Sequence, residues 1–120
     1  MRKVLVVDDA VTMRQMVSFT LKRGGYEVIE AEHGQDALDK LQNTTADLVI
    51  TDLNMPVMDG ITLIQNLRKL ASMKNKPILM LTTEGLASKK EAGKAAGATG
   101  WIVKPFDPEK LLQTLAKVLP

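Results

Sequence analysis

The feature that most constrains the fold of this chain is a regular alternation of short apolar runs with longer segments of helical period. The apolar runs are rich in β-branched residues, are four to six residues long and are separated by Gly, Pro or Asn at most junctions. Such runs without in-out alternation are typical of parallel strands that helices cover on both faces. The expected strands are residues 3–7, 26–31, 48–51, 78–82 and 100–103. The alternation therefore predicts an α/β fold with a doubly wound, five-stranded parallel sheet.

Composition excludes several other classes of protein. The chain has 120 residues, which is enough for one core, so we expect a single domain over residues 1–120. It has no cysteine, which excludes disulfides and zinc-thiolate sites. The net charge of +2 is too small to indicate nucleic acid or an anionic membrane as a partner. The apolar run of residues 4–7 ends at Asp8, far short of a signal peptide or a membrane span, so we expect a cytoplasmic protein.

Polar and charged residues follow four of the five expected strands. In an open parallel sheet, ligands bind beyond the carboxyl ends of the strands. Carboxylates that meet there repel one another, and a hard cation removes the conflict. Because all the candidate ligands are oxygens, magnesium is the expected metal. The residues at these strand ends are Asp8, Asp9, Asp52, Thr82, Thr83 and Lys104.

Each of these residues also has an ordinary structural explanation. An acidic pair after a strand is often a turn or a helix cap. A lysine such as Lys104 at a strand end is usually solvated, and Thr82 is a common strand residue. The only histidine, His33, is expected to be a helix-entry or surface residue and not a ligand. The functional interpretation depends on all these strand ends being considered together.

Several motifs resemble those of bacterial two-component response regulators. The segment of residues 52–60, DLNMPVMDG, is similar to the phosphoacceptor loop of that family. The likeness extends over the full chain, and residues 12–14 together with Asn54 and Glu84 are similar to the stand-alone chemotaxis type, the CheY-like receivers. The resemblance implies a flavodoxin-like fold with strand order 2-1-3-4-5. Its other motifs are Val7-Asp8-Asp9, Leu81-Thr82, Ala95-Ala96-Gly97-Ala98 and Val103-Lys104-Pro105-Phe106.

The resemblance also implies a role for each site residue. Asp52 would accept a phosphoryl group from a histidine kinase, with Lys104 as a second positive charge and Thr82 as a hydroxyl donor. Asn54 and Glu84 would influence the rate of dephosphorylation, and the Lys104-Pro105 bond would be cis. Thr83 is a second hydroxyl beside the site, and the family pattern selects Thr82. The implied magnesium ligands are Asp8, Asp9, Asp52 and the backbone carbonyl of Asn54.

The output surface implied by the family is formed by the fourth helix, the fifth strand and the fifth helix. Trp101 occupies its switch position, where relatives commonly have tyrosine, and packing on the sheet edge is an equally ordinary explanation for this aromatic. Three nearby lysines could attract an acidic partner or could simply be solvated. They are Lys89, Lys90 and Lys94. The implied partner is an output protein such as a component of the flagellar motor switch.

Three other functions fit the sequence less well. A phosphatase of the haloacid dehalogenase class needs a second Asp two residues after its nucleophile, and Asn54 stands there. A flavin- or nucleotide-binding loop would place phosphate where Asp8 and Asp9 repel it. A calcium loop through Asp52, Asn54 and Asp59 lacks the required spacing. We therefore expect a monomeric signalling protein that acts only on its own Asp52 and is not an enzyme with a separate substrate.

Overall fold

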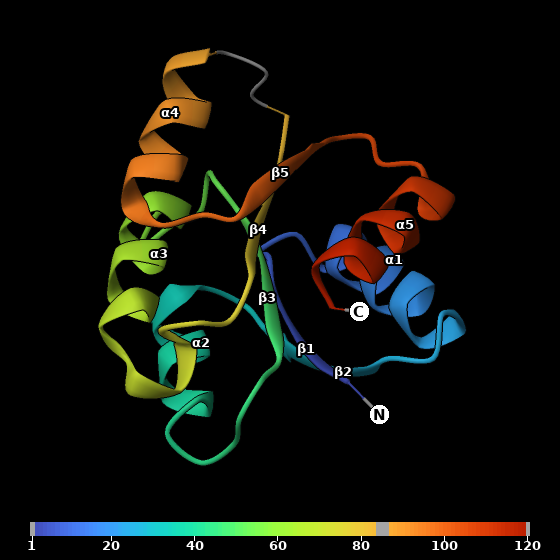
Figure 1. The fold of residues 1–120 in the computed structure, drawn as a ribbon, viewed down its shortest axis with the longest axis horizontal. Coiled ribbons are helices and arrows are strands. Elements are labelled where there is room, and N and C mark those ends of the chain that lie inside the picture. Colours follow the sequence, from blue (N-terminus) through green and yellow to red (C-terminus); the bar gives the residue numbers. More distant parts are fainter. Residues whose placement is uncertain (1, 84–86, 120) are drawn as a thin grey trace.

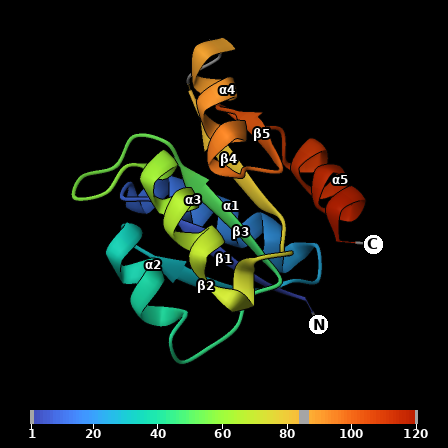
Figure 2. The same ribbon diagram turned by 60° about the vertical axis from the view of Figure 1, so that its left-hand side comes forward.

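The five strands form one sheet with helices on both faces (Figure 1). The computed structural model describes residues 2–83 and 87–119. Helices α2, α3 and α4 cover one face, and α1 and α5 cover the other (Figures 1 and 2). The elements are β1 (Lys3–Val7), α1 (Val11–Arg23), β2 (Glu27–Ala31), α2 (Gly34–Lys40), β3 (Leu48–Asp52), α3 (Gly60–Lys69), the 3-10 helix η1 (Ala71–Met73), β4 (Ile78–Thr82), α4 (Ala87–Ala96), β5 (Gly100–Val103) and α5 (Pro108–Val118).

All four strand pairs are parallel, and the strand order is β2-β1-β3-β4-β5. The predicted fold class and strand order are therefore confirmed. Two predicted strand ends were wrong by one residue. Strand β2 begins at Glu27, because the N–H of Tyr26 donates to the carbonyl of Leu21 at the end of α1. Strand β3 continues through Asp52, because the ladder to β4 extends to the pair Asp52 and Leu81.

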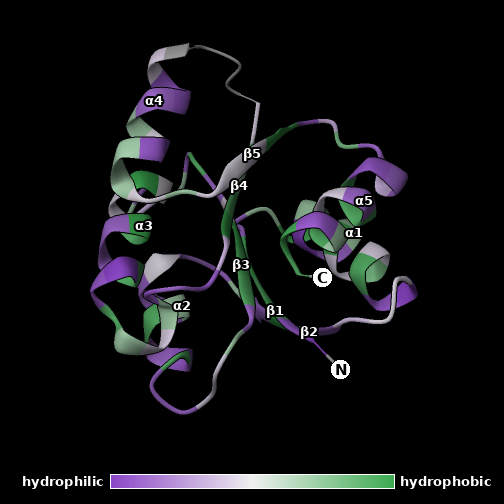
Figure 3. Ribbon diagram, viewed as in Figure 1, coloured by the Kyte–Doolittle hydropathy of each residue, from purple (hydrophilic) through white to green (hydrophobic). Residues whose placement is uncertain are grey.

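The apolar residues of the strands alternate between two cores, one on each face of the sheet. Leu5 and Val7 of β1 belong to the core beneath α2 and α3, whereas Val4 and Val6 belong to the core beneath α1 and α5. The central strands are hydrophobic along their length (Figure 3). This double burial explains why the strand sequences are continuous apolar runs. It also fixes the register, because a shift by one residue would exchange the two faces.

Side chains accept from free backbone N–H groups at the starts of α2, α3 and α5. Asp107 caps α5 by accepting from the N–H of Glu109 at 2.9 Å, as its position before Pro108 predicts. His33 caps α2, where its Nδ1 accepts from the N–H of Asp36 at 3.1 Å. The expectation that His33 is a helix-entry residue is confirmed. Asp59 caps α3, where its Oδ1 accepts from the N–H of Thr62 at 2.8 Å.

Gly93 of α4 packs against the side chain of Met80 on β4. A Cβ atom at this position would lie 2.4 Å from Cε of Met80, so the end of that flexible side chain would have to move to admit a larger residue. Gly93 lowers helix propensity, and its lack of a side chain leaves room for Met80. Within the part of the chain that the structure describes, no helix has the length and apolarity needed to cross a membrane.

Candidate phosphoacceptor site

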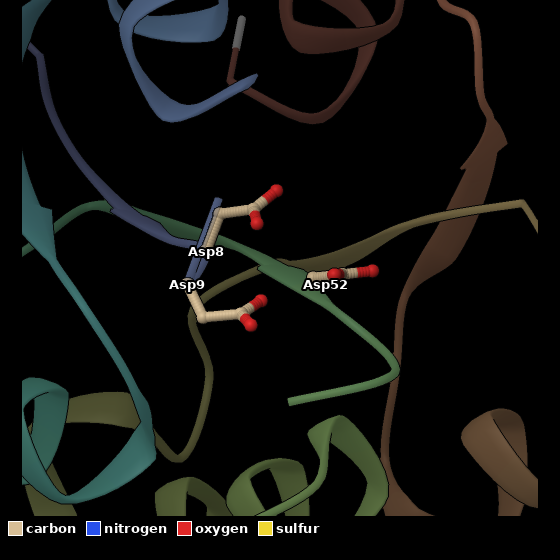
Figure 4. A group of neighbouring side chains, drawn as sticks. All are labelled: Asp8, Asp9 and Asp52. Carbon is tan, nitrogen blue, oxygen red and sulfur yellow. The ribbon is translucent and has the colours of Figure 1, made fainter. Parts of the chain in front are cut away.

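Three carboxylates meet at the carboxyl edge of the sheet. Asp8 and Asp9 directly follow β1, and Asp52 is the last residue of the adjacent strand β3 (Figure 4). One oxygen atom from each carboxylate lies within 4.8 Å of the other two. Asp8 is 2% exposed and Asp52 is 9% exposed, whereas Asp9 is exposed. The predicted convergence of these side chains is therefore present in the structure.

The carboxylate of Asp52 is held through one of its two oxygens. Its Oδ1 accepts from the backbone N–H of Leu53 at 2.8 Å and lies 3.3 Å from Nζ of Lys104. Its Oδ2 accepts no hydrogen bond from the described residues. Burial raises the pKa of Asp52, the charge of Lys104 lowers it and the charge of Asp8 raises it again, so that the pKa is above its ordinary value.

Lys104 links the two most buried carboxylates. Its Nζ lies 3.2 Å from Oδ2 of Asp8 and 3.3 Å from Oδ1 of Asp52, and its side chain is only 11% exposed. The backbone N–H of Lys104 donates to the carbonyl of Thr82 at 2.8 Å, which joins the ends of β4 and β5. The Lys104-Pro105 bond is cis, as the resemblance implies.

The loop between β3 and α3 folds back tightly onto the end of β3. The N–H of Gly60 donates to the carbonyl of Leu53 at 2.8 Å. A Cβ atom at Gly60 would lie 2.3 Å from the carbonyl oxygen of Asp52 and 2.9 Å from Cα of Leu53. Only glycine fits this close approach of the helix start to the backbone that carries Asp52.

The two neighbouring threonines differ in burial. Thr82 is 1% exposed, whereas Thr83 is exposed. Thr82 pairs in register with Val103 of β5, and Met80 pairs with Trp101. Since alternate residues of a strand share a face, Thr82 and Trp101 lie on the same face of the sheet in adjacent strands. That face is the one covered by α4.

Trp101 lies on this face and is partly exposed to solvent. The residue is 41% exposed, and Nζ of Lys90 on α4 lies 4.8 Å from the centroid of its ring. This distance is within the range of a cation–π interaction. Lys89 and Lys94 are exposed on the same helix and so remain available to solvent. The structure thus brings Trp101 and Lys90 together, a pairing that the sequence pattern did not specify.

Asn54 and Glu84 are the remaining residues that the sequence singled out. Asn54 is exposed in the loop after β3, two residues beyond Asp52. Its predicted role as a carbonyl ligand stays a prediction. Glu84 lies outside the described residues, so its predicted effect on dephosphorylation also stays a prediction.

The group of donors fits a hard divalent cation. Three carboxylates and one ammonium give the cluster a formal charge of −2, and every candidate ligand atom is an oxygen. Asp9 forms no ion pair or hydrogen bond through its carboxylate with the described residues, so it is free to bind an ion. Oxygen ligands that keep part of the hydration shell are what Mg²⁺ prefers.

Two contacts around the site were not predicted from the sequence. The backbone N–H of Leu53 holds Asp52, and Arg14 of α1 donates to the backbone carbonyl of Asp8 at 2.7 Å. Because almost every residue has a backbone N–H, the residue type does not show which of these groups donates to a site. Arg14 could have been suspected, because it is a charged residue adjacent to the apolar positions of α1 and only six residues after Asp8.

The fold and the site define the class of protein. Residues 4–116 match the response regulator receiver domain family, and the chain belongs to that family. Among its relatives, the Chemotaxis protein CheY1 of Helicobacter pylori is 46% identical over 119 residues, which cover 98% of this chain and 96% of the relative. The Chemotaxis protein CheY homolog of Campylobacter jejuni is 44% identical over 119 residues, which cover 98% of this chain and 92% of the relative.

Solved structures agree with this assignment. The chemotaxis protein CheY4 of Vibrio cholerae superimposes with a TM-score of 0.96 at 55% sequence identity, and the match covers 99% of each chain. A putative response regulator of Chloroflexus aurantiacus has a TM-score of 0.94 at 38% identity. The predicted membership of the response regulators, with chemotaxis proteins as homologues, is confirmed. The phosphatase and nucleotide-binding alternatives are set aside by the same findings.

Proposed function

We propose that this receiver domain accepts a phosphoryl group from a histidine kinase on Asp52. The observation that carries the proposal is the position of the Asp52 carboxylate. It lies beside Asp8, Asp9 and the ammonium of Lys104, at the edge of the sheet where ligands of such folds bind. Membership of the receiver family supports the same assignment.

The contacts of Asp52 suit a nucleophile in phosphoryl transfer. Leu53 and Lys104 hold Oδ1, which leaves Oδ2 to form the new bond to phosphorus while the bond from phosphorus to the donor nitrogen breaks. Lys104 is near enough to stabilise charge on the transferred oxygens. Because phosphoryl transfer depends mainly on position and charge, these fixed contacts are the principal contribution of the protein.

Magnesium is the proposed cofactor, and its ligands are Asp8, Asp9, Asp52 and the backbone carbonyl of Asn54. When bound, the ion would neutralise the charge that develops on the phosphoryl oxygens. Asp8 is already paired with Lys104, so it is suited to a contact through water. Asp9 is the most exposed of the three carboxylates, so it is the one that a hydrated ion reaches first.

The Asp9→Asn variant is expected to bind Mg²⁺ at least about tenfold more weakly than the wild type, because one of three converging carboxylates loses its charge. Isothermal titration with MgCl₂ measures the affinity, and incorporation of label from a small phosphodonor measures the reaction. Both should fall together in Asp9→Asn. The Asp59→Asn variant removes the same charge from the cap of α3 and should match the wild type. Unchanged Mg²⁺ affinity in Asp9→Asn would refute the metal site.

Phosphorylation is proposed to change the surface formed by α4, β5 and α5. Thr82 and Trp101 share one face of adjacent strands, so movement at the end of β4 is transmitted to the space beside the indole. Lys90 contacts the ring in the present conformation, and this contact favours the outward position of Trp101. The phosphoryl group shifts the equilibrium only as far as it contacts the two conformations differently.

The fluorescence of Trp101, the only tryptophan, is expected to change on phosphorylation. Thr82→Ala should reduce the change while Asp52 is still labelled, because the lost hydroxyl couples the phosphoryl group to β4. Thr83→Ala removes the neighbouring exposed hydroxyl and should give the full change. Emission spectra recorded with and without a small phosphodonor and Mg²⁺ provide the test. Identical spectra in the two states of the wild type would show that the indole does not switch.

The biological output is proposed from the relatives. Those with the highest similarity described above are chemotaxis proteins, so we infer that this chain signals in chemotaxis to an output protein such as a flagellar motor switch component. Residues 1–120 would act as one monomeric receiver domain in the cytoplasm. The autophosphatase reaction, tuned by Asn54 and Glu84, belongs to the same proposal. The protein turns over no separate substrate in this scheme.

A further inference from the structure

Arg14 connects helix α1 to the acidic pair that follows β1 and to strand β2. Its Nη1 donates to the backbone carbonyl of Asp8 at 2.7 Å, and its Nε donates to Oε1 of Glu30 on β2 at 3.0 Å. The guanidinium is largely removed from solvent, since the side chain of Arg14 is 12% exposed. A buried arginine with two such partners is fixed in both position and orientation.

The contacted carbonyl belongs to the peptide bond that joins Asp8 to Asp9. Because a peptide bond is planar, fixing this carbonyl also fixes the N–H and Cα of Asp9. The Asp8 side chain has its own supports in the N–H of Ala10 at 2.9 Å and in Lys104 at 3.2 Å. The Asp9 side chain has no such support from the described residues. Its direction therefore depends on the backbone that Arg14 holds.

We propose that Arg14 is a positioning residue for the metal site, and that Glu30 orients it. The proposal rests on the Mg²⁺ site described under the proposed function. Arg14 contacts neither the acceptor Asp52 nor any of the three candidate ligand carboxylates, and it acts through the backbone of Asp8 and Asp9. Glu30 balances the charge of the guanidinium and holds its Nε, which leaves Nη1 directed at the carbonyl.

A positioning role and a purely electrostatic role for Arg14 predict opposite changes in Mg²⁺ affinity when Arg14 is replaced. A positive charge near a cation site repels the cation, so removing it would tighten Mg²⁺ binding if charge were its only effect. If Arg14 positions Asp9, removing it releases the Asp8-Asp9 peptide and weakens binding. Residues that hydrogen-bond to metal ligands without contacting the metal typically contribute about 10- to 100-fold to metal affinity. The sign of the change therefore distinguishes the two roles.

The test is titration of the metal-free protein with MgCl₂ in a calorimeter. We expect Arg14→Ala to bind Mg²⁺ about tenfold more weakly. Arg14→Lys keeps the charge but lacks the planar group that reaches both partners, and it should restore only part of the affinity. Arg23→Ala is the matched control on the same helix. Arg23 forms an ion pair with the exposed Glu109 at 3.1 Å and does not contact the site, so this variant should bind Mg²⁺ with wild-type affinity.

A mutational cycle tests the part assigned to Glu30. Glu30→Gln should weaken Mg²⁺ binding in the wild type and have no further effect in Arg14→Ala, since Glu30 acts through Arg14. Thermal unfolding of each metal-free variant, followed by circular dichroism, shows which proteins are folded at the titration temperature. If Arg14→Ala is unfolded there, the folded Arg14→Lys variant decides, and wild-type affinity in it would overturn the proposal.

Unchanged or tighter Mg²⁺ binding by folded Arg14→Ala overturns the positioning role. That failure is distinguishable from failure of the proposed function. If Asp9→Asn loses the metal and Arg14→Ala keeps it, the metal site stands and only the role of Arg14 is wrong. If the wild type itself binds no Mg²⁺, both the metal site and the role of Arg14 are wrong.

Discussion

Replacing Lys104 with methionine is expected to destabilise the metal-free protein by about 3 kcal/mol and, at the same time, to tighten Mg²⁺ binding by about tenfold. The ammonium is largely buried between Asp8 and Asp52, at 3.2 and 3.3 Å. Without it, two adjacent buried carboxylates repel each other with no compensating charge. A bound cation then relieves a larger repulsion and no longer competes with an ammonium for the same oxygens.

Chemical denaturation in the presence and absence of MgCl₂ measures both effects in one experiment. The Lys94→Met variant removes the same charge from an exposed position on α4 and should change neither quantity appreciably. Equal loss of stability with and without Mg²⁺ would show that Lys104 and the ion do not share the carboxylates, which would contradict this prediction. Labelling of Asp52 should still fall in Lys104→Met, because the second positive charge at the site is lost.

The Gly60→Ala variant is expected to lose roughly 3 kcal/mol of stability, at the upper end of the usual range for overpacking. The added methyl group would meet backbone atoms, with the carbonyl oxygen of Asp52 at 2.3 Å and Cα of Leu53 at 2.9 Å. Neither atom can rotate away as a side chain does. The start of α3 or the end of β3 must therefore move, and Asp52 moves with it.

Gly100→Ala is the matched control for this substitution. A Cβ atom at Gly100 would have Leu79 Cδ2 as its nearest neighbour at 3.5 Å, which is an ordinary contact. This variant should be neutral or slightly stabilising. Urea denaturation gives the free energy of unfolding for both proteins. A Gly60→Ala protein as stable as Gly100→Ala would show that the loop after Asp52 is not tightly closed on the strand.

Much of the fold is predictable from the sequence because burial on both faces leaves continuous apolar strands. The order of the strands came from the family resemblance, since apolar runs alone do not specify which strands are neighbours. The two wrong strand ends have a local cause in backbone hydrogen bonds. Tyr26 bonds to α1, and Asp52 continues the ladder with β4, neither of which depends on side-chain type.

The site was predictable to the level of residue type and strand end. Asp8, Asp52 and Lys104 come together because parallel strands place their carboxyl ends at one edge. The choice of Thr82 over Thr83 agrees with burial of the first and exposure of the second. The sequence makes Arg14 a suspect near the site, but it does not specify the contacts of Arg14 with Asp8 or of Lys90 with Trp101, because these join different elements through long side chains whose direction depends on packing.

Locating the phosphoryl group tests whether Asp52 is the phosphoacceptor. The protein is allowed to react briefly with a small phosphodonor and Mg²⁺, is digested, and its peptides are sequenced by mass spectrometry. We expect one modified residue, Asp52, and no modification in Asp52→Asn. A phosphoryl group on Asp8, Asp9 or Asp59, or undiminished labelling of Asp52→Asn, would contradict it.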